Sequence, residues 1–387
     1  MPQVDRLLVV DPICSRRAPT IRAWLQVAEK VLPKHFKEVE VWSMECDLDQ
    51  PWVKWRKFPK ITRFWPIQCA AFRFMAWRAY KRLPKPQLQN TLVQATGEHL
   101  PRTDIRYIQF WNITYAEIAK VKPVELRAPF KERVFRNWAI QGERKCLEPG
   151  ATGEWWCVSR GIATPIAAPP GSIFRYLPNS YDPERFNPAF RAASRSDSRK
   201  HYQFGEEDIV FVFAGFGHFV RKGLLQAVKV VNRLRQQGNP ATLLVLGGTE
   251  GTVADFRRLM DLQGESAEAI RFAGHVSPPE WHLSAGDALL FPSHFEAFSL
   301  VEIEAAALGL RLYLTAHPGS EMILREGENG RLLPWNVDGM VATLSEDIAS
   351  GVIRETHCEM GEALSPDPYA ALLSSLYSDA ILKKLRA

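Results

Sequence analysis

Two glutamates stand eight residues apart in the segment FPSHFEAFSLVEIEAAALGLRLYLT (291–315), which reads as a strand, a loop, a helix and a further strand. Glu296 lies in the loop, and Glu304 lies inside the helix expected over about 299–308. A carboxylate accepts hydrogen bonds from paired hydroxyls, so Glu304 could clamp a ribose and Glu296 could bind sugar hydroxyls. Glu302 is about 200° around the helix from Glu304 and should face elsewhere. Taken alone, Glu304 could also be a solvated helical glutamate.

A second segment, FAGFGHFVRKG (213–223), places glycines after a strand and a basic pair at the start of a helix. Backbone N–H groups at a helix N-terminus attract anions. Arg221 and Lys222 add two cations suited to phosphate, and Gly215 and Gly217 let the loop turn close to it. The segment could therefore hold a diphosphate. The simpler alternative is a glycine turn beside two solvated cations.

Strands alternate with helices along the whole chain, which predicts α/β domains with doubly wound parallel sheets. In the first half, strands are expected at 6–11, 39–44, 91–97, 105–111 and 154–159. In the second half, they are expected at 208–216, 241–248, 270–276, 287–293 and 310–315. Such sheets bind ligands at the carboxyl ends of their strands, and two of them in one chain put a cleft between them.

The segment APPG at 168–171 interrupts this alternation and is the expected hinge. We therefore predict an N-terminal Rossmann-like domain over 1–172 and a C-terminal one over 173–365. A last helix within 366–387 is expected to cross back to the N-terminal domain. The polar segment 191–208 is expected to be an exposed loop that runs into a helix.

Composition excludes several classes of protein. With 46% hydrophobic and 24% charged residues, the chain is globular and not disordered. No apolar run approaches the roughly 20 residues of a membrane-spanning helix. Acidic residues in the first apolar run favour a strand over a signal peptide. The 6 cysteines include no C-x-x-C pair, which is typical of reduced thiols in a cytosolic protein.

The net charge of +6 hides an asymmetry between the two halves. Residues 1–200 hold 34 Lys and Arg against 19 Asp and Glu, a net charge of +15. Residues 201–387 hold 15 against 24, a net charge of −9. The first half should therefore seek anionic partners.

The stretch 52–83 holds no Asp or Glu and crowds aromatic residues among Lys and Arg. Pro66 and Pro84 bound a predicted helix in it. One side of this helix should pack on the N-terminal sheet: Trp65, Cys69, Phe72, Ala76, Ala79, Tyr80 and Leu83. Cations and apolar groups mix on the other side and just before it: Trp52, Trp55, Arg56, Lys57, Phe58, Arg63, Ile67, Phe74, Arg78, Lys81 and Arg82. This mixture predicts a surface for anionic lipid headgroups, with a soluble anionic acceptor or a solvated face as alternatives.

Together with the junction YLPNSYDPERFNP (176–188), the two site segments resemble the retaining GT-B glycosyltransferases of family 4, glycosyl transferases group 1. That family typically shows P-N-G-V-D-x-x-R-F-x-P at the domain junction, and this chain keeps Pro178, Asn179, Asp182, Arg185, Phe186 and Pro188. The E-x7-E spacing of the family is kept at Glu296 and Glu304. Its glycine pair after a strand is matched by Gly247–Gly248, and its later motifs by IRFAGHVS (270–277) and EMILREGENGRLL (321–333). The resemblance is dense over about 176–335.

The resemblance implies transfer of a sugar from a UDP- or GDP-sugar to a glycan or lipid-linked acceptor, with retention, in cell-envelope polysaccharide or lipopolysaccharide synthesis. Lys222 would neutralise the diphosphate, Glu304 would bind the nucleotide ribose and Glu296 would contact the transferred sugar. Other donor contacts would come from Gly215, Gly217, Gly274, His275, Val276, Phe298, Ser299 and Leu300. No metal and no cofactor besides the donor is expected. The leaving phosphate would help to take the acceptor proton.

Two features depart from the family pattern. Phe216 stands where many relatives have a phosphate-binding Arg, so Arg221 is the candidate substitute, with Lys222 and the helix dipole as the alternative. The segment DPICSRRAPT (11–20) replaces the glycine-rich turn that often follows the first strand. Contacts to the sugar and the acceptor on that side are therefore not predicted.

The N-terminal half is the expected acceptor side. Its stretch 95–117 resembles, more loosely, the lipopolysaccharide core glucosyltransferase, which would place Glu98, His99 and Asn112 beside the cleft. A lone His near a strand end more often has a structural role, so His99 carries both interpretations.

Two other patterns are interpreted as structural. Asp47–Leu48–Asp49 is a D-x-D, the metal signature of the other main glycosyltransferase fold, but its place after a second strand favours a solvated loop. The 9 histidines show no metal-ligand spacing.

Two other functions remain as alternatives. A nucleotide-sugar 2-epimerase shares the fold. A nucleic-acid-binding protein would use the basic half and bind with steep salt dependence, but it would not explain Glu296 and Glu304. The expected location is the cytoplasm, with peripheral association at the inner face of the cytoplasmic membrane.

Overall fold

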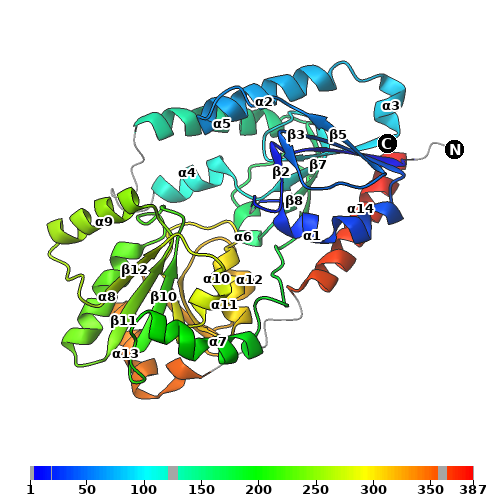
Figure 1. Cartoon of the computed structure of the whole chain (residues 1–387). Coiled ribbons are helices and arrows are strands. Elements are labelled where there is room, and N and C mark those ends of the chain that lie inside the picture. Colours follow the sequence, from blue (N-terminus) through cyan, green and yellow to red (C-terminus); the bar gives the residue numbers. More distant parts are fainter. Residues whose placement is uncertain (1–3, 19, 121–129, 356–363, 387) are drawn as a thin grey trace. The chain divides into compact units, whose positions relative to one another are not determined.

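The computed structural model describes residues 4–18, 20–120, 130–355 and 364–386, which form two compact units (Figure 1). The first unit contains residues 4–120, 130–180 and 366–386, and the second contains residues 181–355 and 364–365. Each unit is built on one parallel sheet, which confirms the predicted α/β class with two Rossmann-like domains. None of the helices in the described ranges is long and apolar enough to cross a lipid bilayer.

The sheet of the first unit has the strand order β5-β3-β1-β6-β7-β8-β9, with every pair parallel. Its strands are β1 (Arg6–Val10), β3 (Glu38–Ser43), β5 (Val53–Lys57), β6 (Thr91–Thr96), β7 (Thr103–Ile108), β8 (Thr152–Cys157) and β9 (Ile173–Tyr176). Two short strands, β2 (Ile13–Cys14) and β4 (Glu45–Cys46), pair separately. The run of apolar residues in β1 is buried because strands flank it and helices cover both faces of a parallel sheet.

Sequence patterns missed the two edge strands. The residues of β5 are mostly exposed and basic, as is common for an edge strand, so their composition hid their pairing with β3. On the opposite edge β9 pairs with β8, which extends the first unit to Ser180. The boundary predicted between 172 and 173 is therefore wrong, because the chain adds one more strand after its proline turn before it leaves the unit.

Helices surround this sheet. They are α1 (Arg22–Val31), α2 (Trp65–Tyr80), α3 (Lys85–Gln89), α4 (Asn112–Lys120), α5 (Phe130–Cys146), α6 (Arg160–Ala163) and α14 (Pro366–Arg386), with a 3-10 turn η1 (Leu32–Lys34) after α1. The last helix, α14, belongs to this unit and lies against α1 (Figure 1). Its buried Tyr377 accepts a hydrogen bond from Trp24 Nε1 at 2.9 Å and donates one to Gln94 Oε1 at 2.7 Å.

Helix α2 follows most of its predicted burial pattern. Cys69, Phe72, Ala76 and Ala79 are buried, and Tyr80 and Leu83 are partly buried against the same core. Trp65, however, is 45% exposed, so its predicted place in the core is wrong.

Two buried residues, one polar and one aromatic, occupy core space that the predicted pattern did not give them. Gln68 fills the core position near the start of α2, because its side-chain oxygen accepts hydrogen bonds from the backbone N–H groups of Ile61 and Thr62. Phe58 was expected on the surface but is buried, and its ring meets Phe72 edge-on at a centroid distance of 5.4 Å.

The sheet of the second unit has the order β12-β11-β10-β13-β14-β15. Its strands are β10 (Ile209–Ala214), β11 (Ala241–Leu246), β12 (Ile270–Gly274), β13 (Ala288–Phe291), β14 (Arg311–Thr315) and β15 (Gly330–Leu333). Its helices are α7 (Pro188–His201), α8 (Leu224–Gln236), α9 (Glu250–Leu262), α10 (Pro279–Leu283), α11 (Leu300–Ala307), α12 (Ser320–Ile323) and α13 (Val337–Ala349), with a 3-10 turn η3 (Val352–Arg354). The order reverses between β10 and β13, which is where such sheets bind ligands.

The polar segment expected as an exposed loop is largely helix α7. Its Arg195 and Arg199 contact the buried carboxylate of Asp287 at 2.5 and 3.5 Å. The same carboxylate accepts a hydrogen bond from Val210 N at 2.8 Å, at the start of β10. The segment looked solvated because its cations have their anionic partner about ninety residues later in the chain.

We expect Tyr377→Phe to lower the free energy of unfolding of the first unit by about 1–3 kcal/mol, because Gln94 and Trp24 would be left buried without their shared partner. Leu382→Ala is the matched control on α14: Leu382 is exposed, and the change should stay within about 0.5 kcal/mol. Chemical denaturation of the full chain measures both variants. Equal stabilities would show that this hydrogen-bond chain does not anchor α14.

Candidate functional site

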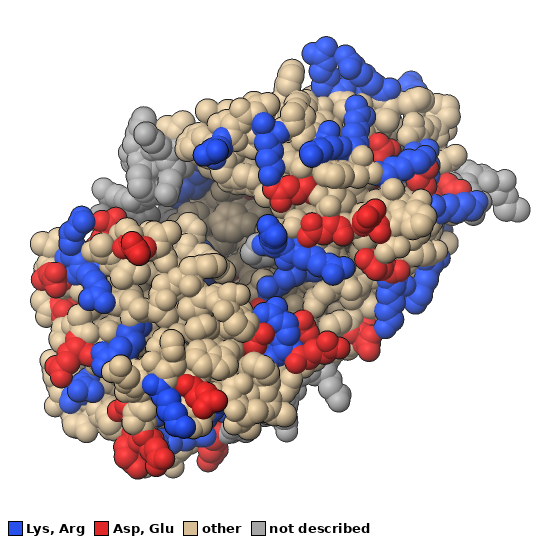
Figure 2. Space-filling model, in the orientation of Figure 1, with Lys and Arg blue, Asp and Glu red and all other residues tan. Residues whose placement is uncertain are grey.

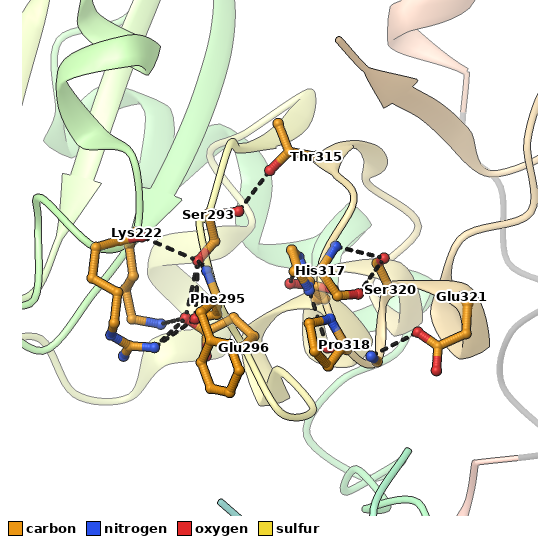
Figure 3. A network of polar contacts seen from close by, with 12 residues as sticks. Lys222, Ser293, Phe295, Glu296, Thr315, His317, Pro318, Ser320 and Glu321 are labelled. Carbon is orange, nitrogen blue, oxygen red and sulfur yellow. Dashed lines mark hydrogen bonds and ion pairs between the residues drawn. The ribbon is translucent and has the colours of Figure 1, made fainter. Parts of the chain in front are cut away.

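Two loops of the second unit leave neighbouring strands at their carboxyl ends. One loop connects β10 to α8, and the other connects β13 to α11. Because β10 and β13 pair directly, the loops lie against each other, and His294 N donates a hydrogen bond to Arg221 O at 2.9 Å. Three side chains that the sequence predicted for one site, Arg221, Lys222 and Glu296, therefore meet. Figure 3 labels Lys222 and Glu296.

Glu296 is the centre of this cluster. Its Oε1 lies 2.8 Å from Lys222 Nζ and 3.2 Å from Arg221 Nη1, and it accepts a hydrogen bond from Ser293 Oγ at 3.3 Å. The side chain is only 12% exposed. Burial alone would raise the pKa of Glu296, but the charges of Lys222 and Arg221 lower it below its usual range. The cluster thus holds an ionised carboxylate between two cations.

Glycines let the β10–α8 loop reach this arrangement. Gly223 caps α8 at a φ of +79°, and a Cβ there would lie 1.9 Å from the carbonyl oxygen of Pro292. At Gly215 a Cβ would come within 2.9 Å of Lys222 Cδ. A side chain at either position would displace Lys222 or the β13 loop. These glycines therefore place the ammonium group beside Glu296.

Arg221 makes two contacts with the loop after β13. Its Nη1 donates a hydrogen bond to Phe295 O at 2.6 Å as well as contacting Glu296. The guanidinium thus braces the β13 loop. Lys222 lies at the end of the β10–α8 loop, and its compact ammonium group contacts Glu296. It remains the candidate for neutralising the diphosphate.

The helix that follows, α11, carries the rest of the predicted ribose and phosphate contacts. Ser299 is its N-cap residue, and Phe298 and Ser299 are buried, while Leu300 is half-buried. Glu304 is also buried, on the same helix. Arg185 of the junction motif makes a bidentate pair with Glu280 at 2.9 and 2.7 Å, so the motif arginine is a structural ion pair within this unit.

The site contains a buried pair that sequence reasoning missed. Glu302, which was expected to face elsewhere than Glu304, is fully buried, and its Oε1 lies 3.1 Å from His317 Nε2. Burial opposes a charge on His317, but the carboxylate of Glu302 outweighs it and raises the pKa of His317. No local signal links these residues, because they meet only when β13 and β14 bring their loops together.

The loop after β14 is tied to the site through hydrogen bonds. Thr315 Oγ1 donates to Ser293 O at 2.7 Å, and Ser320 Oγ donates to His317 O at 2.8 Å (Figure 3). Gly319, at a φ of +93°, donates its N–H to Glu321 Oε2 at 2.7 Å. The buried His317 therefore lies in a loop held to the one that carries Glu296.

The residues predicted for the nucleotide base lie after β12. Gly274 ends that strand and accepts a hydrogen bond from Gly247 N at 2.6 Å. The His275 ring lies 6.2 Å from the ring of Phe216, which is 77% exposed. Phe216 thus forms an open aromatic surface with the exposed His275, and the half-buried Val276 follows His275 in the chain.

The acceptor-side candidates lie in the first unit. Asn112 donates its backbone N–H and Nδ2 to Glu143 Oε1 at 2.6 and 2.8 Å, at the start of α4. Burial raises the pKa of Glu143 to about 8. The amide of Asn112 is thus used within the fold. His99 meets Phe72 edge-on at 5.8 Å, which suits the structural interpretation of this residue.

The D-x-D pattern is part of an exposed loop. Asp47 Oδ2 accepts hydrogen bonds from Ser15 Oγ and Arg16 N, both at 2.8 Å. The hydrogen bond from Ser15 lowers the pKa of Asp47 despite slight burial. In the part of the chain that the structure describes, no three His, Cys, Asp or Glu side chains gather as a metal site would require.

Residues 208–349 match the family described as Glycosyl transferases group 1. Glycogen synthase of Mycobacterium tuberculosis (strain ATCC 25618 / H37Rv) is 34% identical over 126 residues, 32% of this chain and 30% of that protein. D-inositol 3-phosphate glycosyltransferase of Stackebrandtia nassauensis is 31% identical over 231 residues, 56% and 49% of the two chains. This chain therefore spans half or less of the length of these curated relatives.

Solved structures extend the likeness to nearly the whole chain. WaaG, a glycosyltransferase involved in lipopolysaccharide biosynthesis, superposes with a TM-score of 0.67 at 18% identity over 98% of both chains. Anabaena HepE in complex with UDP and glucose superposes with a TM-score of 0.62 at 11% identity, over 97% of this chain and 100% of that one. The chain has the GT-B fold, and its residues 208–349 match the group 1 glycosyl transferase model.

We expect the stability of the second unit to fall as the pH rises above about 6.5, through the raised pKa of His317. A raised pKa in the folded state means that the bound proton stabilises the fold at lower pH, and that this contribution is lost once the proton leaves. His317→Gln should remove this dependence and lower stability at pH 6 by about 3–5 kcal/mol, because Glu302 would be buried without its cation.

The double variant Glu302→Gln/His317→Gln serves where the single variant fails to fold, since two neutral amides can share a hydrogen bond. His275→Gln is the control, because His275 is exposed. Denaturation curves between pH 6 and 9 measure the effect. A slope that persists in the double variant would assign the dependence to another group.

Proposed function

We propose that this protein is a retaining glycosyltransferase that moves a sugar from a nucleotide-sugar to a glycan or lipid-linked acceptor. One observation carries the proposal: Glu296 and Lys222 form a buried pair at the switch point of the second sheet, within a group 1 glycosyltransferase domain. The buried Glu304 follows on the adjoining helix, at the spacing the family uses.

The chemistry of transfer needs charge stabilisation where the diphosphate leaves. Lys222 is held within a loop at the sheet edge, so its ammonium can stabilise the developing charge without reorganising. Glu296, kept ionised by its two cations, can accept hydrogen bonds from the hydroxyls of the transferred sugar. Glu304 can accept the two ribose hydroxyls. The leaving phosphate then takes the acceptor proton, and positioning supplies most of the rate.

The nucleotide is proposed to lie across the loops after β10 and β12. Phe216 and His275 offer an open aromatic surface for the base. The HepE structures were solved with UDP-glucose and with UDP, which supports a UDP-sugar as the first donor to test. Relatives that act on inositol phosphate and phosphatidyl-myo-inositol, and WaaG in lipopolysaccharide biosynthesis, support a cell-envelope acceptor.

We predict that Lys222→Ala and Glu304→Ala each lower donor turnover tenfold or more, because each removes a charged contact to the donor. Lys229→Ala is the matched control and should keep activity, because Lys229 lies on α8, the helix that follows Lys222. The rate is measured without a known acceptor as hydrolysis of the donor, detected by the free nucleotide that is released. Near-normal turnover in both variants would refute the assignment of Lys222 and Glu304 as donor-binding residues.

The donor is identified first by calorimetry with UDP, GDP, ADP and CMP on the full chain. One of these should bind, and Lys222→Ala should weaken it more than Lys229→Ala. Binding of none would count against the proposed function. Conversion of the donor to its 2-epimer, with no transfer, would instead identify an epimerase.

We also propose that the first unit docks on anionic lipid through its basic-aromatic surface, defined as the exposed cations and apolar residues of β5, of α2, of the segment between them and of the two positions after α2. The apolar members are Trp55, Ile61, Phe64, Trp65, Ile67 and Phe74. The cationic members are Lys54, Arg56, Lys57, Lys60, Arg63, Arg78, Lys81 and Arg82. Figure 2 shows Lys and Arg gathered over the part of the molecule that α2 occupies in Figure 1. Exposed apolar groups among cations suit an anionic interface.

We expect the protein to float with phosphatidylcholine vesicles that contain phosphatidylglycerol and not with pure phosphatidylcholine vesicles. Ile67→Ser/Phe74→Ser should reduce the floated fraction severalfold, because both side chains project from the exposed face of α2. Leu262→Ser is the control, since Leu262 is an apolar residue of the second unit that is even more exposed than Ile67 and Phe74. Equal recovery with both lipids, or none, would refute the docking.

A further inference from the structure

A pocket lies in the first unit between α2 and α5, which run side by side in Figure 1. Its volume is about 340 Å³, which is the size of a small-ligand site. Arg73 and Trp77 come from α2, Trp138 and Lys145 from α5, and Glu98 from the turn after β6. The pocket is therefore at the carboxyl end of a central strand of the first sheet, where α/β sheets bind ligands.

The guanidinium of Arg73 is fixed in this pocket but incompletely bonded. It lies over the ring of Trp138, with Cζ 3.8 Å from the ring centroid. Among the residues that the structure describes, its buried Nη1 has no hydrogen-bond partner. A buried donor without a partner costs about 1–3 kcal/mol. This nitrogen is packed against Gly142, but Arg73 lines the pocket, so its positive charge can act on a bound anion.

A glycine in α5 makes room for this guanidinium. A Cβ on Gly142 would lie 2.0 Å from Arg73 Nη1 and 2.9 Å from Glu98 Cγ. Glycine inside a helix costs about 1 kcal/mol relative to alanine. The bare backbone of Gly142 thus forms the floor of the pocket and lets Arg73 and Glu98 sit side by side. Neither residue has a role in the donor site of the second unit.

The lining defines the class of ligand. Arg73 and Lys145 place two cations against the single carboxylate of Glu98, so an anionic group is favoured. Glu98 can accept hydrogen bonds from hydroxyls, and Phe74 with Trp77 forms an apolar wall that the C–H face of a sugar ring can cover. A phosphate alone would leave Glu98 and the aromatic wall unused, and a neutral sugar would leave the cations unused.

We propose that this pocket binds a sugar that carries a phosphate or carboxylate group, as an anionic part of the acceptor. The assignment to the acceptor rests on the proposed function, but binding in the pocket does not. The acid group pairs with Arg73 and Lys145, and the ring hydroxyls face Glu98. The site lies beside the exposed Phe74 of the basic-aromatic surface, so a lipid-anchored acceptor could reach it from a membrane.

Ligand-observed NMR with the full chain tests the pocket, with glucose 6-phosphate, glucose and inorganic phosphate as probes. Glucose 6-phosphate should bind, and glucose and phosphate should bind at least tenfold more weakly. Arg73→Met should weaken glucose 6-phosphate tenfold or more because it removes the cation. Gly142→Ala should do the same because its methyl group occupies the space of the guanidinium, while it suits a helix better than glycine.

Arg144→Met is the matched control, since Arg144 is exposed on α5 and lines no part of the pocket. Binding of UDP, measured on the same samples, reports whether each variant is folded and whether the donor site works. Absence of glucose 6-phosphate binding with intact UDP binding would overturn the pocket proposal alone. Equal binding in the wild type, Arg73→Met and Gly142→Ala would overturn it too.

Vesicles separate the two sources of phosphate. Phosphatidylcholine vesicles with and without phosphatidylglycerol are added to the wild type with bound glucose 6-phosphate. Persistence of binding with both supports a sugar ligand. Displacement only by phosphatidylglycerol, lost in Arg73→Met, would overturn the sugar assignment and identify a lipid headgroup as the occupant.

Discussion

A carboxylate buried at the edge of a parallel sheet constrains most of the second unit. Glu296 could not stay ionised at 12% exposure without cations beside it, since desolvation of an unpaired charge is far too costly. Both cations come from the loop of the neighbouring strand, and that loop reaches Glu296 only because Gly215 and Gly223 have no side chains. The strand order, the glycine positions and the two cations are therefore all required to keep Glu296 ionised.

Further buried charges stabilise the same sheet from other directions. Asp287 pairs with Arg195 and Arg199 of α7, and Asp347 of α13 pairs with Arg311 of β14 at 3.0 Å. Removing one member of such a pair leaves an uncompensated charge inside the protein. These pairs therefore fix which helix covers which part of the sheet. Asp287 and Asp347 are thus two acidic residues of the second half whose charges are paired inside the fold.

The sequence was sufficient where the determining signal is local. The α/β alternation predicted the strands of both main sheets except β5, β9 and β15, and it placed Lys222 and Glu296 in loops that follow strands. It was insufficient where the partner lies far along the chain. Glu302 and His317 meet only through the pairing of β13 with β14. The edge strand β5 is mostly exposed and basic, and the edge strands β9 and β15 are only 4 residues long, so all three lacked the long apolar run that marks a central strand.

Side-chain exposure was harder to predict than secondary structure. Periodicity placed Trp65 in the core, but the polar side chain of Gln68 fills that space because it satisfies nearby backbone donors. The sequence did not predict the pocket between α2 and α5, because the role of the helical Gly142 depends on its contact with the guanidinium of Arg73 from another helix. Three-dimensional packing, and not residue type, defines such features.

The position of α14 in the first unit has a consequence for synthesis. Tyr377 is bonded to Trp24 of α1 and Gln94 of β6, yet it is made after every strand of the second sheet. During synthesis on the ribosome, residues 181–355 can therefore complete their core first. At that time the first unit still lacks α14, the helix that covers part of the core of the first unit. The nascent first unit must keep the apolar surface around Trp24 from misassociating until α14 emerges, so the N-terminal part of the chain is the last to be completed.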